Sequence, residues 1–133
     1  MMSTLAQPLS RFVVWSNVFY LLPLAAALFV GFWTDAAVLA ALIVTSTAFH
    51  LSRERQFSRA DIAASIVVIG VNAVACYLGN FKMPYFGIVC ALMLAALYIR
   101  YRVERGGRGS IAHGWWHIIA ASTLTACVFT YAG

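Results

Sequence analysis

Five apolar segments, each about as long as a membrane-crossing helix, constrain what this chain can fold into. The hydrocarbon core of a bilayer needs roughly 20 helical residues, and helices satisfy their backbone polar groups internally. Hydrophobic residues make up 63% of the 133 residues and charged residues only 10%, which excludes an ordinary soluble domain. We predict one all-α integral membrane domain, residues 1–133, with helices over 12–33, 35–52, 60–79, 84–101 and 111–131.

Short polar connections separate these segments. We expect a tight turn around Thr34-Asp35, a basic loop at 53–59, a turn at 80–83 and a loop at 102–110. The loop at 102–110, RVERGGRGS, is rich in Gly and charge and is the only clear flexible linker. The first segment is too long for a signal peptide, so we expect a retained helix.

The basic residues indicate an orientation. Of the nine Lys and Arg residues, only Lys82 falls on the far side of the predicted bundle, and eight arginines fall on the N-terminal side. Cytoplasmic loops of membrane proteins carry such an excess. We therefore expect the N-terminus in the cytoplasm and the C-terminus outside. This distribution explains the net charge of +5 without nucleic-acid binding.

Five polar residues are predicted to share the cytoplasmic depth of the bundle. They are Ser46, His50, Asp61, His113 and His117, and they include the chain's three histidines. His113 and His117 are four residues apart and therefore lie on one helical face, as do Ser46 and His50. Ionisable side chains inside a bilayer are costly, so this cluster indicates a functional site.

Three imidazoles with an open fourth position are typical of a catalytic zinc site. In such a site Asp61 could orient the zinc-bound water and take its proton, and Ser46 could hydrogen-bond the water or a developing oxyanion. The three cysteines map to the opposite leaflet without CxxC spacing, so we interpret them as small core residues: Cys76, Cys90 and Cys127.

Each site residue also fits a structural role when it is taken alone. His113 and His117 could hydrogen-bond between helices, and His50 could sit at a helix end near the headgroups. Asp61 could interact with a helix macrodipole, and Ser46 could bond its own helix backbone. The joint placement of the residues favours the metal site.

Three stretches carry a family resemblance. They are WSN at 15–17 followed by Pro23, STAFH at 46–50 with Asp61 eleven residues after the histidine, and HGWWHI at 113–118. These stretches resemble the alkaline ceramidases, integral-membrane zinc amidases. Their superfamily includes the adiponectin-type receptors and the Per1-type lipid-remodelling proteins.

The resemblance implies roles for the site residues. His50, His113 and His117 would be zinc ligands, Asp61 would hold or activate the zinc-bound water, and Ser46 would assist at the water or the substrate carbonyl. The implied reaction is hydrolysis of the amide, less favourably an ester, in a ceramide-like N-acyl membrane lipid. It would release a fatty acid.

The chain departs from the family in two ways. The family core has seven helices, so the chain would be a shortened, five-helix version. An open, lipid-facing site or a homo-oligomer could replace the missing wall of the substrate pocket. Animal ceramidases also carry an acidic N-terminal calcium site, which we do not expect here because residues 1–34 contain no Asp or Glu.

Two other functions stay open from the sequence. The missing helices favour a non-catalytic zinc-binding membrane module, such as a receptor-like or assembly partner. Histidines in membrane helices can also hold haem, although bis-His ligation normally takes one histidine from each of two helices.

Overall fold

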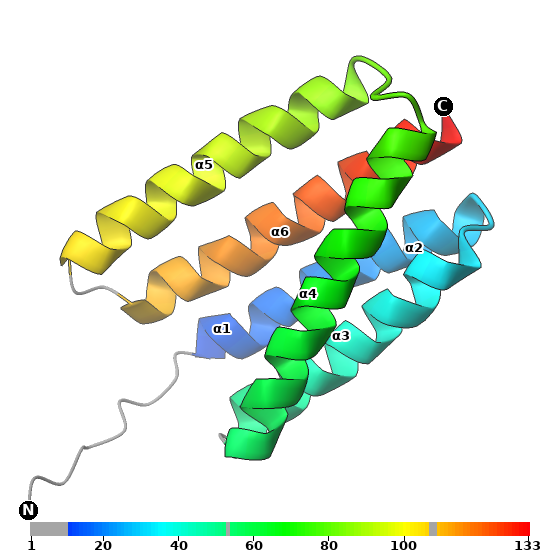
Figure 1. The fold of residues 1–133 in the computed structure, drawn as a ribbon. Coiled ribbons are helices and arrows are strands. Elements are labelled where there is room, and N and C mark those ends of the chain that lie inside the picture. The colour runs from blue at the N-terminus through cyan, green and yellow to red at the C-terminus, as the bar shows by residue number, and fades with distance from the viewer. Residues whose placement is uncertain (1–10, 53, 107–108) are drawn as a thin grey trace, which may run out of the picture.

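The computed structural model describes residues 11–52, 54–106 and 109–133, and these ranges contain helices and no strand (Figure 1). The first apolar segment is formed by α1 (Arg11–Ser16), the 3₁₀ turn η1 (Asn17–Tyr20) and α2 (Leu21–Phe29). The later helices are α3 (Trp33–Ser52), α4 (Arg55–Leu78), α5 (Tyr85–Gly106) and α6 (Gly109–Ala132). The all-helical fold class predicted from the sequence is confirmed.

Among the described residues, four helical segments are long and apolar enough to cross a membrane. They are Arg11–Phe29, Trp33–Ser52, Arg55–Leu78 and Tyr85–Arg102. The helix α6 is outside this group, and it lies among the others, in contact with α1, α2, α4 and α5. Because α6 packs against protein on several sides, it can carry histidines that would be costly on a lipid-facing helix.

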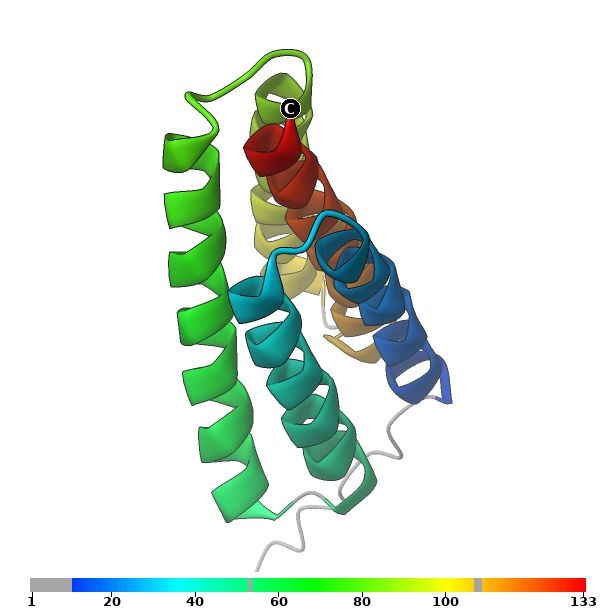
Figure 2. The same ribbon diagram turned by 90° about the vertical axis from the view of Figure 1, so that its right-hand side faces the viewer.

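The helices alternate in direction, so each end of the bundle gathers particular residues (Figure 2). The start of α1, the α3–α4 connection and the α5–α6 connection share one end. The α2–α3 turn, the α4–α5 turn and the C-terminus share the other end. Alternation therefore brings the end of α3 and the starts of α4 and α6 together, as the sequence predicts.

The core is apolar and so is much of the outer surface. Leu39, Val68 and Val128 are almost fully buried where α2, α3, α4 and α6 meet. Large apolar side chains such as Phe29 and Leu94 are exposed, at 87% and 68%. Water would disfavour such a surface, whereas lipid would not. Long apolar helices with an exposed apolar surface are consistent with a multi-pass membrane protein.

Two predicted connections are wrong in their bounds. The helix α4 begins at Arg55, so most of the expected basic loop at 53–59 is helical. The helix α5 continues to Gly106 and α6 begins at Gly109, which removes most of the expected linker at 102–110. Arginine and glutamate are good helix formers, so charge alone does not end a helix.

The turn expected around Thr34-Asp35 lies earlier in the chain. Gly31 adopts a φ of 74°, which suits glycine, and α3 then starts at Trp33. Asp35 is therefore in the first turn of α3, with none of its surface exposed, and Asn72 Nδ2 donates to its Oδ1 over 2.7 Å. This polar pair joins α3 to α4 at the end of the bundle away from the histidines.

Candidate metal centre

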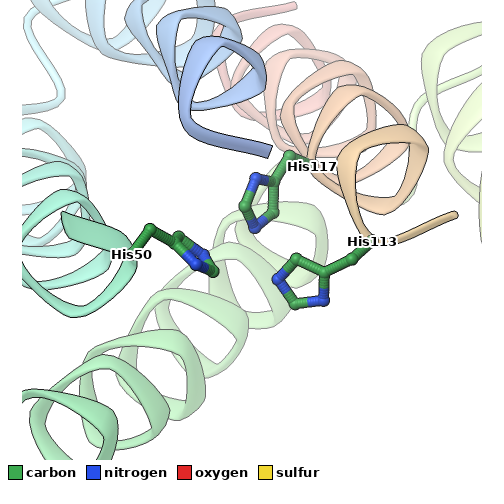
Figure 3. Close-up of side chains that lie close together, drawn as sticks. All are labelled: His50, His113 and His117. Atoms are coloured by element: carbon green, nitrogen blue, oxygen red, sulfur yellow. The ribbon is translucent and has the colours of Figure 1, made fainter. Parts of the chain in front are cut away.

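The three histidines come together at one end of the bundle, as the sequence predicts (Figure 3). His50 is in the last turn of α3, and His113 and His117 are in the first half of α6. One ring nitrogen from each lies within 4.8 Å of the others. The ring centroids of His113 and His117 are 4.7 Å apart, and His50 is 5.1 Å from each.

The environment of these rings suits a bound cation. His50 and His117 are buried, whereas His113 is exposed and forms the open side of the cluster. Neither ring nitrogen of His50 has a hydrogen-bond partner among the described residues. Buried polar atoms are nearly always partnered, so two orphan nitrogens beside two further imidazoles need an explanation. A metal ion would satisfy one of them.

The donor set fits a transition metal in type and nearly in spacing. Imidazole nitrogens bind zinc, copper, iron and nickel. A tetrahedral zinc with bonds of about 2.0–2.1 Å holds its nitrogens about 3.4 Å apart. The three ligand atoms, all within 4.8 Å of one another, would have to move inward by at most about 1 Å each.

The first helical segment contributes residues that the sequence analysis did not assign to the site. Ser16 Oγ lies 2.8 Å from His117 Nδ1, and the Tyr20 ring packs 5.6 Å from the His117 ring, centroid to centroid. Ser16 and Asn17 are 1% and 4% exposed. They are the only small polar side chains between residues 12 and 29. Their isolation in an apolar segment is the sequence feature that could have identified them as site residues.

Ser46 connects the first segment to Asp61. Ser46 is 2% exposed, and its Oγ donates to Asn17 Oδ1 over 3.2 Å. The partly buried carboxylate of Asp61 lies close enough to interact with the same hydroxyl. The structural role considered for Ser46, a bond to its own helix, is therefore wrong, because its partners lie on other elements. Asp61 is not among the donor atoms that cluster with the histidines.

The Ser46 hydroxyl has two acceptors but only one hydrogen to donate. A serine hydroxyl has one hydrogen, so Ser46 can donate it fully to either Asn17 or Asp61. The amide nitrogen of Asn17 has no partner among the described residues. A half-turn of that amide would let Asn17 Nδ2 donate to Ser46 Oγ, which frees the hydroxyl hydrogen for Asp61.

An apolar cavity of about 430 Å³ lies between α4, α5 and α6. Its lining includes Tyr20 and Ser65 at the histidine end and Cys76 and Phe86 toward the other end. Ser65 Oγ donates to the backbone oxygen of Asp61 over 2.8 Å, so the cavity begins one helical turn from Asp61. The cavity therefore adjoins the residues that surround the histidine cluster.

Comparison of the chain with protein-family models, with curated proteins and with solved structures finds no match. The resemblance to the ceramidases therefore rests on residues of this chain alone.

Proposed function

We propose that this chain is a zinc-dependent integral-membrane hydrolase that cleaves the amide of a ceramide-like N-acyl lipid. The observation that carries the proposal is the convergence of His50, His113 and His117 from two helices, with orphan buried nitrogens. The apolar cavity beside this cluster supports a lipid as the substrate. The HGWWHI stretch and its resemblance to the ceramidases favour an amide over an ester.

The three histidines would hold the metal. Zinc supplies a Lewis acid there and makes water acidic enough to attack a carbonyl near neutral pH. Three protein ligands leave a fourth position open, as in catalytic rather than structural zinc sites. The exposed edge of His113 is the side from which a substrate carbonyl could approach.

Asp61 would act as the general base and then as the general acid. Its carboxylate takes a proton from the attacking water and passes it to the leaving nitrogen. The C–N bond breaks as a C–O bond forms, giving a fatty acid and an amine. Ser46 supports this role because its hydroxyl is a hydrogen-bond partner of Asp61.

The cavity suits a fatty acyl chain. From Ser65 to Cys76 it follows α4 over eleven helical steps, which is about 17 Å at 1.5 Å per step. The lining side chains are mostly apolar, so the cavity would favour a hydrocarbon chain over a polar ligand. An acyl chain in the cavity would bring its amide to the Tyr20 and Ser65 end, beside Asp61.

We further infer that the metal site faces the cytoplasm. Eight of the nine basic residues belong to the histidine side in the sequence, and the positive-inside rule then gives the orientation. Arginines at this end, including Arg55 and Arg59 at the start of α4, would attract an anionic headgroup or a fatty acid product.

Turnover by zinc-loaded protein tests the enzyme directly. Fatty acid release from a ceramide in mixed micelles is measured for the wild type and for Asp61→Asn. Asp61→Asn removes the proton acceptor and keeps the side-chain shape, so we expect kcat to fall about 10²–10⁴-fold while zinc stays bound. The matched control is Ser122→Ala, which loses only a bond to its own helix backbone and should keep full activity.

Two results would contradict this proposal. Full activity in Asp61→Asn would remove Asp61 from the mechanism. Zinc-loaded wild-type protein without turnover on amide or ester lipids would favour the alternative, a non-catalytic zinc-binding membrane module.

A further inference from the structure

We infer that Ser16 is a positioning residue for the metal centre, because it fixes His117 in the tautomer whose Nε2 is free to bind a metal. The inference rests on the proposed metal site. It concerns a residue of the first helical segment whose side-chain hydrogen bonds in the described structure reach Val13 and His117.

Counting hydrogens gives the tautomer. Ser16 Oγ lies 2.7 Å from the carbonyl oxygen of Val13 and 2.8 Å from His117 Nδ1. A carbonyl can only accept, so the single hydroxyl hydrogen of Ser16 is donated to Val13. The serine oxygen must then accept a hydrogen from His117 Nδ1. A neutral imidazole with a hydrogen on Nδ1 has a lone pair on Nε2.

The orientation of the ring agrees with this assignment. In Figure 3 one nitrogen of His117 points toward the ribbon of the first helical segment, and the other points between His50 and His113. The nitrogen toward the first segment is Nδ1, since Ser16 contacts it. Nε2 is therefore the atom that faces the other two histidines. Metal-binding histidines commonly donate their second ring nitrogen in this way.

Burial makes this bond effective. Ser16 is 1% exposed and His117 is 4% exposed, so water has little access to compete for either partner. A hydrogen bond in such surroundings is stronger than one at the surface. The bond therefore holds the His117 ring in both tautomer and orientation before a metal arrives.

The sequence also provides for the close approach of α1 to α6. Gly114 is one turn before His117, and a Cβ at this position would overlap the Phe12 ring of α1. Glycine at 114 therefore lets α1 lie near enough for Ser16 to reach His117. His50 has no comparable partner, because both of its nitrogens are orphans. His117 is the preorganised ligand of the three, and His50 is the one that the metal itself must orient.

The first test reads the tautomer in the wild type. Nitrogen NMR of metal-free, detergent-solubilised protein distinguishes a protonated Nδ1 from a protonated Nε2 on His117. We expect the hydrogen on Nδ1. A hydrogen on Nε2 would overturn the inference without any substitution, and this outcome does not depend on whether the protein is a hydrolase.

The second test is zinc affinity, measured by competition with a chelating dye. Ser16→Ala removes the hydroxyl that accepts from His117 Nδ1–H and leaves the Val13 backbone oxygen as the remaining partner of that ring. Loss of such a partner typically weakens metal binding about 10–100-fold. Ser16→Thr keeps the hydroxyl and should recover most of the affinity. Ser122→Ala, a serine bonded only to the Ile118 carbonyl, should bind zinc like the wild type.

The outcomes separate the two claims. Wild-type zinc affinity in folded Ser16→Ala would overturn the role of Ser16 and leave the proposed hydrolase intact. Weaker zinc binding in Ser16→Ala, in a protein that shows no lipid hydrolysis, would support the role of Ser16 and contradict the hydrolase.

Discussion

At the scale of single residues, Ser46 links two parts of the candidate site. Its hydroxyl contacts Asn17 of the first segment and Asp61 of α4. With the Asn17 amide turned so that the Ser46 hydroxyl donates to Asp61, Ser46→Ala removes a hydrogen bond to a charged group, which is worth about 1.5–3 kcal/mol. We expect kcat for lipid hydrolysis to fall about 10–100-fold. Zinc content should stay unchanged, because Ser46 is not a ligand.

This prediction is checked by measuring zinc and kcat in the same preparation. Thr45→Ala is the matched control, since Thr45 is adjacent in α3 but donates only to carbonyls of its own helix. Loss of zinc together with activity in Ser46→Ala would show that the residue supports the fold or the metal rather than Asp61.

The sequence predicted the residues that repeat along one helix better than those that meet across helices. His113 and His117 are four apart, so their shared face follows from helical geometry alone. Ser16 meets His117 across 101 positions of sequence, and no local pattern encodes that contact. Ser46 was predicted to lie near the histidines from its spacing to His50, but its contacts with Asn17 and Asp61 depend on how three elements pack.

At the scale of elements, the contact between α4 and α6 requires a glycine. A Cβ at Gly79, at the end of α4, would overlap the backbone carbonyl of Thr130 in α6. Backbone cannot move aside as a flexible side chain can, so the two helices would have to separate. We expect Gly79→Ala to destabilise the protein by about 1–3 kcal/mol.

The control for this prediction is Gly70→Ala in the same helix. A Cβ at Gly70 meets no atom within 4 Å, so alanine should be neutral or stabilise the helix by up to about 1 kcal/mol. Thermal unfolding of both variants in detergent gives the comparison. Equal melting temperatures for Gly79→Ala and Gly70→Ala would contradict the close approach.

The lengths of the apolar segments predicted the elements, but their ends were less predictable. The predicted helix at 60–79 begins at Arg55 in the structure, because arginine and glutamine continue a helix beyond its apolar part. The burial of Asp35 was also not predictable, since its partner Asn72 is 37 positions away. Hydropathy identifies the part of a helix that could cross lipid and says little about the turns beyond it.

At the scale of the whole molecule, the alternating direction of successive helices predicted that the three histidines lie at the same end of the bundle. The cavity between α4, α5 and α6 could not be predicted, because it arises from how side chains pack along α6. The helix α6 has both a packing role and a place in the candidate site. It contacts most of the other helices, and its first half supplies two of the three histidines.

The central claim is that three histidines from α3 and α6 hold one zinc ion. Elemental analysis of detergent-purified protein tests it most directly, with His50→Ala and His117→Ala beside the wild type and Ser122→Ala as the control. We expect about one zinc per chain in the wild type and the control, and loss of zinc in both histidine variants, because two ligands bind zinc far less tightly than three. Folded wild-type protein without zinc, or zinc retained in both histidine variants, would contradict the account.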